Sequence, residues 1–282
     1  MSPDERSRAA RRAAEAALVR ITHHYNGQPE FVVVGGLIPE FHCSRSSFKH
    51  AGTTDIDVQV NLEIFCGSRN AQRLEHALRN SEFMPDSERV WRWKSENDSS
   101  IVVKFELLAD FDDKPAQVQI IFNECDSLGA VNLRGTGLAT KDVEERELQA
   151  KIGGVTHKAT IKITGVCGFL MAKCAAAHSR RKPKDWYDIA FVLLHNDDGQ
   201  PRDLAEKAHE IYSGELLGWK PALEDLHANF ENGDAQGPAA YAEQLLFDYP
   251  EEDQSLAAAD AVLAVTSFCS TLLSLIRARS GS

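Results

Sequence analysis

Apolar and polar residues alternate in short runs over much of the first half of the chain and take a helical spacing over the second half. Two-residue alternation is typical of half-buried strands, and a spacing of three to four residues is typical of amphipathic helices. The pattern predicts an α+β chain, with a mixed-sheet domain over residues 1–165 and a helical domain over 166–282. The predicted strands are 31–34, 55–62, 99–108, 116–123 and 158–164, and the predicted helices are 4–25, 37–43, 68–80, 168–179, 185–195, 202–213, 221–231, 237–247 and 254–278.

Two carboxylates share one face of the strand predicted over 55–62. Because side chains alternate along a strand, Asp55, Asp57 and Gln59 point one way and the apolar residues between them point into the core. Neighbouring carboxylates repel each other unless a cation lies between them, and Mg²⁺ prefers such oxygen ligands. The pattern therefore favours a metal site that handles a nucleotide, with a solvated sheet edge as the alternative.

A glycine pair ends the strand at 31–34. Gly35 and Gly36 allow a tight turn and close approach of a phosphate, and the short helix predicted next would have its amino end at the pair. The pair matches neither the P-loop nor the dinucleotide fingerprint. An ordinary turn is the alternative interpretation.

A third acid is predicted on the strand at 99–108. Glu106 shares a face with Lys104, opposite the apolar face of this strand. If the strand lies beside Asp55 and Asp57, Glu106 completes a three-carboxylate cluster. The alternatives are a solvated Glu106 beside Lys104, or Asp110 as the third acid.

A lysine in an alanine-rich helix precedes a basic loop and two further acids. Lys173 is surrounded in sequence by small and apolar residues, which suggests a partly buried lysine with a dedicated anion. Asp185 is a candidate N-cap for the next helix, and Asp188 lies about one turn further along it. The basic loop contains Arg180, Arg181, Lys182 and Lys184, of which Arg181 and Lys182 are candidate phosphate ligands. In the alternative interpretation Lys173 extends to solvent, Asp185 only caps a helix, and the loop is solvated.

These features in this order resemble the nucleotidyltransferase AbiEii/AbiGii toxin family, a branch of the polymerase-beta-like nucleotidyltransferase superfamily. The similarity covers roughly residues 31–194. Its most specific part is the lysine-bearing helix followed by the Arg-x-Lys-Pro-Lys-Asp-x-Tyr-Asp run that ends at Asp188.

The resemblance implies a nucleotidyltransferase-like fold and metal-dependent transfer of a nucleoside monophosphate from an NTP to a hydroxyl. Asp55 and Asp57 match the metal-binding pair of the family, and Glu106 is the expected third ligand for one or two Mg²⁺. Gly35 and Gly36 match its nucleotide-contacting turn. Lys173, with Asp185 or Asp188, matches its later catalytic motifs. The resemblance also suggests a tRNA 3′ end as acceptor, and a toxin-antitoxin system with a cognate antitoxin protein as partner.

Charge and cysteine usage indicate which partners and which cellular compartment to expect. The net charge of −11 argues against a broadly basic nucleic-acid-binding surface, although the basic loop remains a local patch suited to phosphates of a nucleotide or an RNA end. The six cysteines are scattered without zinc-site spacing, as reduced cytosolic thiols are. No secretory leader is evident, and the apolar run 261–276 is too short to span a bilayer. The sequence thus predicts a cytoplasmic enzyme without membrane association.

Two other functions fit the same residues. One is a nucleotidyltransferase that modifies a small molecule, such as the hydroxyl of an antibiotic, and the acidic net charge suits this acceptor. The other is a non-catalytic nucleotide-binding regulatory protein. The presence of both Asp55 and Asp57 favours an enzyme.

Overall fold

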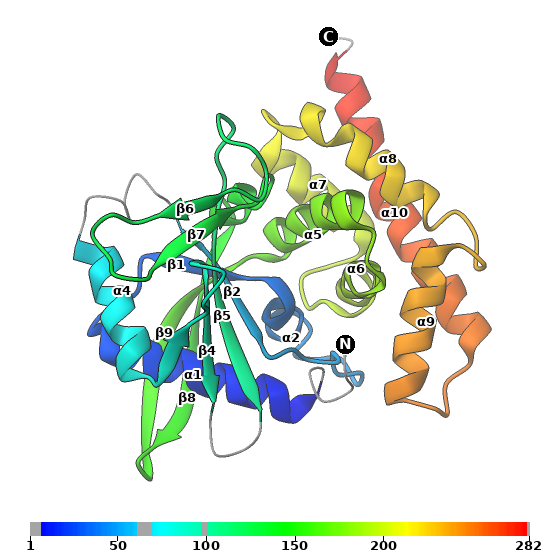
Figure 1. Cartoon of the computed structure of the whole chain (residues 1–282). Helices are drawn as coiled ribbons and strands as arrows, with labels where there is room; N and C mark the ends of the chain where they lie inside the picture. The colour runs from blue at the N-terminus through cyan, green and yellow to red at the C-terminus, as the bar shows by residue number, and fades with distance from the viewer. Residues whose placement is uncertain (1–6, 61–68, 97–100, 281–282) are drawn as a thin grey trace. The chain divides into compact units, whose positions relative to one another are not determined.

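The computed structural model describes residues 7–60, 69–96 and 101–280, which form two compact units (Figure 1). The sheet unit comprises residues 1–38 and 52–164, and the helical unit comprises residues 39–51 and 165–282. The predicted fold class is confirmed: the protein is α+β, with a mixed sheet in its first half and an all-helical region after it.

The sheet unit is built on a single mixed sheet. Its long path runs β3-β4-β5-β2-β1-β9-β8, while β7 pairs with β5 and β6 pairs with β7. Strand β2 lies between β1, which is antiparallel to it, and β5, which is parallel. The strands are β1 (Phe31–Val34), β2 (Asp55–Val60), β3 (Phe83–Pro85), β4 (Arg92–Glu96), β5 (Val102–Ala109), β6 (Gln119–Ile121), β7 (Gly129–Asn132), β8 (Val143–Ile152) and β9 (Val155–Thr164).

The hydrophobic core lies on one face of this sheet. Helix α1 (Arg8–Tyr25) crosses β2, β5, β8 and β9 and packs against α4 (Arg69–Asn80), as Figure 1 shows. Ile56 and Val58 of β2 and Phe105 of β5 are fully buried on the apolar face. The alternation predicted for β2 and β5 is confirmed, so their polar residues occupy the opposite face.

Four strands, β3, β4, β7 and β8, were not predicted. Strand β8 reads Val-Glu-Glu-Arg-Glu-Leu-Gln-Ala-Lys-Ile, and one of its faces is apolar only in its second half, at Leu148, Ala150 and Ile152. It pairs with β9 along its whole length, from Val143 opposite Thr164 to Ile152 opposite Val155. Backbone pairing at a sheet edge holds such a strand although its side chains are charged, a feature that also discourages edge-to-edge aggregation.

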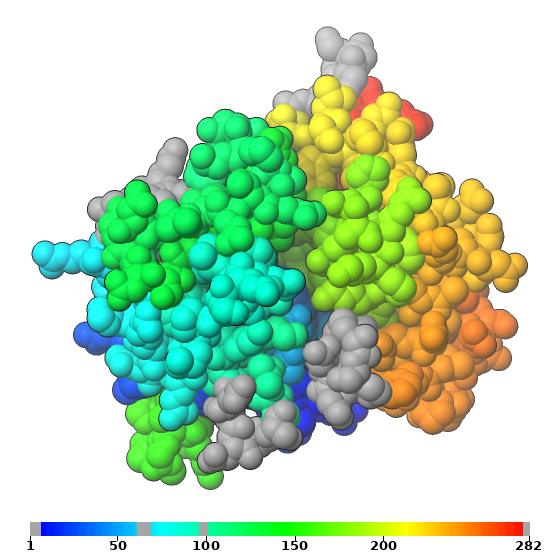
Figure 2. Space-filling model, in the orientation of Figure 1, coloured from blue at the N-terminus to red at the C-terminus, as the bar shows by residue number. Residues whose placement is uncertain are grey.

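The helical unit consists of helices that bury an apolar core. They are α5 (Val166–Arg180), α6 (Pro183–His195), α7 (Pro201–Tyr212), α8 (Lys220–Ala228), α9 (Gln236–Asp248) and α10 (Gln254–Ser280). Figure 2 shows the outer surface of these helices in light green, yellow and orange. Helix α10 packs against α6, α7, α8 and α9. It is also long and apolar enough to cross a membrane, a property that core helices share.

The strap, which we define as residues 39–51, packs with the helical unit although it follows β1 in sequence. Asp197 accepts hydrogen bonds from the backbone N–H of Ser44 at 2.9 Å and of Arg45 at 3.0 Å. The backbone N–H of Lys49 donates to the Tyr249 hydroxyl at 2.7 Å. The strap is therefore tied to the ends of α6 and α9.

Disulfides play no part in the described residues. Cys43, Cys125, Cys167, Cys174 and Cys269 are all thiols, and Cys66 lies outside the described residues.

Acidification is expected to destabilise the helical unit through His195. Burial lowers the pKa of His195 from 6.5 to about 4, and its Nε2 lies 2.9 Å from the Tyr241 hydroxyl. The unfolded chain takes up this proton below pH 6.5 but the folded chain resists it. Stability should therefore fall between pH 6.5 and 4, by up to about 3 kcal/mol.

Urea unfolding at pH 7, 5 and 4 checks this expectation. His195→Gln keeps a hydrogen-bonding side chain but does not titrate, so the wild type should lose more stability than the variant on acidification. Parallel losses in the two proteins would show that His195 is not responsible.

Candidate functional site

The acid cluster, which we define as Asp55, Asp57 and Glu106, lies on the polar face of the sheet unit. Asp55 and Asp57 are on β2, and the parallel register pairs Asp57 with Glu106 of β5. Paired residues of adjacent strands are about 5 Å apart at their backbones. All three side chains are partly buried. The condition set for Glu106 in the sequence analysis, that its strand lies beside Asp55 and Asp57, is thus met.

The glycine turn adjoins the acid cluster directly. Gly35 follows Val34, the β1 residue paired with Asp57, and has a φ of +76°. A Cβ atom on Gly35 would lie 2.0 Å from Asp57 Oδ2, which is far inside van der Waals contact. On Gly36 it would lie 3.1 Å from the Thr53 side chain. The turn therefore needs glycine both for its backbone conformation and for the room it gives to Asp57.

Two cations neutralise part of the acid cluster. Lys104 Nζ lies 3.3 Å from Asp55 Oδ1, and Arg92 Nε donates to Glu106 Oε1 at 2.5 Å. Asp55 Oδ1 accepts no hydrogen bond from the described residues, so its contact with Lys104 is ionic only. Within the described part of the chain, the oxygens of the three acids do not all lie within 4.8 Å of one another.

The donor set nevertheless suits a hard divalent cation. It offers only carboxylate oxygens, which Mg²⁺ prefers. Gly35 has no side chain that would collide with the Asp57 carboxylate. Gln59 continues the same face of β2, and its buried Oε1 has no hydrogen-bond donor among the described residues. Asp55, Asp57 and Glu106 are the residues that would hold the metal.

Asp110, the alternative third acid, has a different role. Its Oδ2 accepts hydrogen bonds from the backbone N–H of Gly135 at 2.9 Å and of Gly137 at 2.8 Å. Burial raises its pKa, against the effect of these two hydrogen bonds. Asp110 therefore stabilises the turn after β7, and the register places Glu106 beside Asp57.

Gly35→Ala is expected to destabilise the sheet unit by about 2–4 kcal/mol, combining backbone strain with the clash against Asp57. Gly154→Ala is a matched control, because Gly154 has a φ of +83° but no atoms within 4 Å of its would-be Cβ. The control should lose only about 1–2 kcal/mol. Urea unfolding of both variants measures the difference, and equal losses would show that the Asp57 contact does not matter.

The Lys173 network, which we define as Lys173, Arg180, Asp185, Asp188 and His50, lies within the helical unit. Lys173 is only 6% exposed. Its Nζ donates to Asp185 Oδ1 at 3.1 Å and to Asp188 Oδ2 at 2.6 Å. The helices α5 and α6 thus meet around a buried cation. The sequence analysis expected a dedicated anion for Lys173, and two aspartates bind it.

Each aspartate of this network has a second partner. Arg180 donates to both carboxylate oxygens of Asp185, at 2.6 and 2.7 Å, and His50 Nε2 lies 2.9 Å from Asp188 Oδ1. Burial acts to raise the pKa of Asp185, but Lys173 and Arg180 outweigh it and lower the pKa. Burial likewise acts to lower the pKa of Lys173, but Asp188 and Asp185 raise it. Both groups therefore stay charged.

The prediction that Asp185 caps a helix was wrong. Helix α6 begins at Pro183, with Lys182 in the N-cap position, so Asp185 lies inside the first turn. Proline at the first helical position has the required φ and needs no hydrogen-bond partner for its nitrogen. The Asp185 side chain is consequently available to Lys173 and Arg180.

The basic loop is less available for phosphates than its composition suggests. Arg180 is bound to Asp185, and Arg181 donates to Asp225 at 2.8 Å. Lys182 is exposed and Lys184 is half-buried. Of the two candidate phosphate ligands, Arg181 is already paired with an acid and Lys182 faces solvent.

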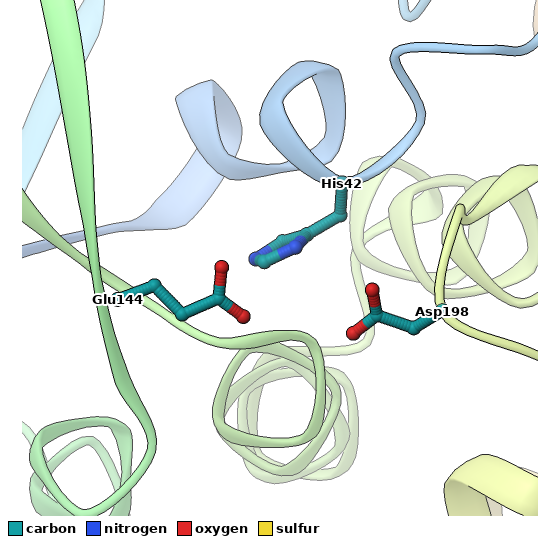
Figure 3. Close-up of side chains that lie close together, drawn as sticks. All are labelled: His42, Glu144 and Asp198. Atoms are coloured by element: carbon teal, nitrogen blue, oxygen red, sulfur yellow. The ribbon is translucent and has the colours of Figure 1, made fainter.

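His42 and Asp198 form a second pair of metal-binding side chains in the helical unit (Figure 3). Ligand atoms of the two residues lie within 4.8 Å of each other. Glu144, also drawn in Figure 3, belongs to β8 of the sheet unit, where it pairs with Arg146. Two ligands are fewer than the three that catalytic zinc sites use, so the pair by itself assigns no metal.

The sequence analysis missed two residues that bind predicted site residues: Arg92, which binds Glu106, and His50, which contacts Asp188. Arg92 comes from β4, a strand with charges on every second position, and His50 comes from the strap. Neither carries a local signal, because each partner is distant in sequence. The acid cluster and the Lys173 network belong to different units, and their joint action in one site stays a prediction.

No family model matches the chain, and no curated protein matches it.

Proposed function

We propose that the chain is a Mg²⁺-dependent nucleotidyltransferase that moves a nucleoside monophosphate from an NTP to a hydroxyl acceptor. The observation that carries the proposal is the register of Asp57 opposite Glu106, next to a glycine turn that leaves room for the Asp57 carboxylate. Three acids gather on one partly exposed sheet face, two of them beside Lys104 and Arg92, and their oxygens are suitable ligands for a metal that binds phosphates.

The residues of the sheet unit position the reactants. Magnesium would supply charge neutralisation at the phosphates of the NTP. Asp55 and Asp57 would hold the metal, and the Gly35-Gly36 turn would accommodate the nucleotide. Glu106, oriented by Arg92, would help to hold the metal and would take up the proton of the incoming hydroxyl.

Lys173 supports the proposal from the helical unit. Lysine has three N–H donors, and two of those on Lys173 are directed to Asp185 and Asp188. The two aspartates position the ammonium group and keep it charged. In this role Asp185 and Asp188 act through Lys173.

Two classes of hydroxyl acceptor fit the proposed activity. The family resemblance favours a tRNA 3′ end, with the chain as the toxin of a toxin-antitoxin pair. A small-molecule acceptor is the second candidate, and it is favoured by the pairing of Arg180 and Arg181 with acids on a protein of net charge −11.

Nucleotidyl transfer is tested with pure protein, Mg²⁺ and each of the four α-³²P-labelled NTPs. Total tRNA is offered in one series and a panel of hydroxyl-bearing small molecules, antibiotics included, in another. We expect labelled acceptor and stoichiometric pyrophosphate with the wild type and neither with chelator. NTP binding without pyrophosphate release would instead indicate a non-catalytic nucleotide-binding protein.

Neutralising Lys182 and Lys184 is expected to discriminate between the acceptors. Both variants Lys182→Gln and Lys184→Gln leave the Arg180 and Arg181 ion pairs in place. If RNA is the acceptor, the double variant should bind tRNA several-fold more weakly. It should also show a shallower salt dependence, because a protein that makes fewer phosphate contacts releases fewer counterions on binding. Affinity for tRNA measured across a salt series checks this, and unchanged affinity would remove the loop from RNA binding.

A further inference from the structure

Large apolar side chains are exposed where α9 and α10 of the helical unit meet. The two helices pack against each other and are joined by residues 249–253. Phe247, near the end of α9, is 67% exposed, and Leu256, near the start of α10, is 59% exposed. Leu263 is 68% exposed and lies seven residues after Leu256, so the two leucines share one face of α10, about 10 Å apart along its axis. Phe247, Leu256 and Leu263, which we call the apolar anchors, are therefore candidates for contact with another molecule.

The same two helices carry negative charge and no positive charge. Residues 236–276 contain no lysine, arginine or histidine. The acids in this stretch are Glu243, Asp248, Glu251, Glu252, Asp253 and Asp260. Six acids and no bases give the stretch a formal charge of −6, out of −11 for the whole chain. More than half of the net charge is thus concentrated on the hairpin that carries the apolar anchors.

Much of this charge is not neutralised within the helical unit. Glu243, Glu252 and Asp260 form no ion pair with the part of the chain that the structure describes. Burial raises the pKa of Tyr241 on α9, and the negative charges of Asp260 and Glu252 raise it further. The hairpin therefore has a negative field that a positively charged partner would relieve.

We infer that the apolar anchors and the six acids around them bind a basic amphipathic segment of a partner protein. Apolar side chains of such a segment would cover Phe247, Leu256 and Leu263, and its lysines or arginines would neutralise the acids. An amphipathic helix offers both kinds of side chain at once, with an apolar face flanked by charge. This binding does not depend on the acid cluster or on the Lys173 network.

The sign of the charge favours this occupant over three others. A second copy of the chain, bound through the same surface about a two-fold axis, would bring six acids against six acids. RNA phosphates and the anionic headgroups of a membrane would be repelled in the same way. A cationic protein segment with an apolar face complements both the anchors and the acids.

An amphipathic peptide of about 18 residues, with leucines on one helical face and lysines on the other, is a suitable probe. Its affinity for the full chain is measured by fluorescence anisotropy across a salt series. One matched peptide has serine in place of each leucine, and a second has glutamate in place of each lysine. We expect the leucine-lysine peptide to bind at least about tenfold more tightly than either, and its affinity to fall as salt rises.

Two double variants locate the binding on this surface. Phe247→Ser with Leu263→Ser should weaken binding of the leucine-lysine peptide by about tenfold or more, because two anchors are lost. Glu252→Gln with Asp260→Asn should weaken it by about threefold and flatten its salt dependence. Leu217→Ser is the matched control, because Leu217 is 67% exposed in the same unit but lies outside the hairpin. Its affinity should stay within about twofold of wild type.

Urea unfolding shows whether each variant is folded. If the serine pair is not, the Gln-Asn pair, which keeps the shapes of its side chains, carries the test. Failure of the leucine-lysine peptide to bind, equal binding of the serine-lysine peptide, or equal weakening by Leu217→Ser would overturn the inference. A wild-type dimer that the serine pair converts to monomer in sedimentation equilibrium would assign the surface to a second copy instead. Binding to vesicles containing phosphatidylglycerol that the serine pair abolishes would assign it to a membrane.

Discussion

Replacing Asp57 with asparagine is expected to abolish nucleotidyl transfer while the sheet unit stays folded. The amide keeps the shape of the side chain beside Gly35 but lacks the charge that a metal ligand supplies. Mutation of a residue that hydrogen-bonds to a metal ligand typically lowers metal affinity or activity by about 10- to 100-fold. The loss of activity for a direct ligand should therefore exceed about a hundredfold. Pyrophosphate release at saturating Mg²⁺ and NTP measures it.

Stability without metal should hold or rise in Asp57→Asn, because the change lowers the negative charge beside Asp55 and Glu106. Asp86→Asn serves as the control, since Asp86 is an acid of the same unit that pairs with Lys94. It should keep its activity. Transfer at the wild-type rate by Asp57→Asn would refute the metal assignment, and a large loss of stability would show that the carboxylate mainly serves the fold.

Lys173→Met is expected to destabilise the helical unit by about 3–5 kcal/mol, because it leaves Asp185 and Asp188 buried without their shared cation. Lys173→Arg should rescue little, since a planar guanidinium does not fit between two carboxylates that hold an ammonium group at 3.1 and 2.6 Å. Urea unfolding followed by circular dichroism measures both variants.

A double-mutant cycle separates the network from simple loss of packing. Lys173→Met combined with Asp188→Asn removes one buried negative charge along with the positive one and should be more stable than Lys173→Met alone. Additive losses would mean that Lys173 and Asp188 do not depend on each other. If the double variant is stable but inactive, the ammonium group is needed for the reaction and not only for the fold.

The residues of the candidate site differ in how far local sequence could predict them. Ile56 and Val58 mark the apolar face of β2 by strict alternation, so the common face of Asp55 and Asp57 followed directly. The pairing of Asp57 with Glu106 is non-local and could only be stated as a condition, because strand register depends on contacts with the rest of the sheet. The parallel register of β2 and β5 meets that condition.

Other elements had no local signal. Strand β4 carries Arg92 and Lys94 around a single buried Trp93, and β8 is held by its pairing with β9. Backbone hydrogen bonding to a neighbour outweighs low strand propensity in both cases. His50 was missed because its partner, Asp188, lies 138 residues away.

The strap has a consequence for the order in which this protein folds during synthesis. Lys49 donates a hydrogen bond to Tyr249, which is synthesised 200 residues later. At a synthesis rate of about 5–20 residues per second, the strap spends roughly 10–40 s without its partners after it leaves the ribosome. During that interval the helical unit cannot fold completely, because part of its chain has not been synthesised. A chain cut after the sheet unit would carry the same thirteen residues, 39–51, with nothing to bind, so no single cut separates the two units cleanly.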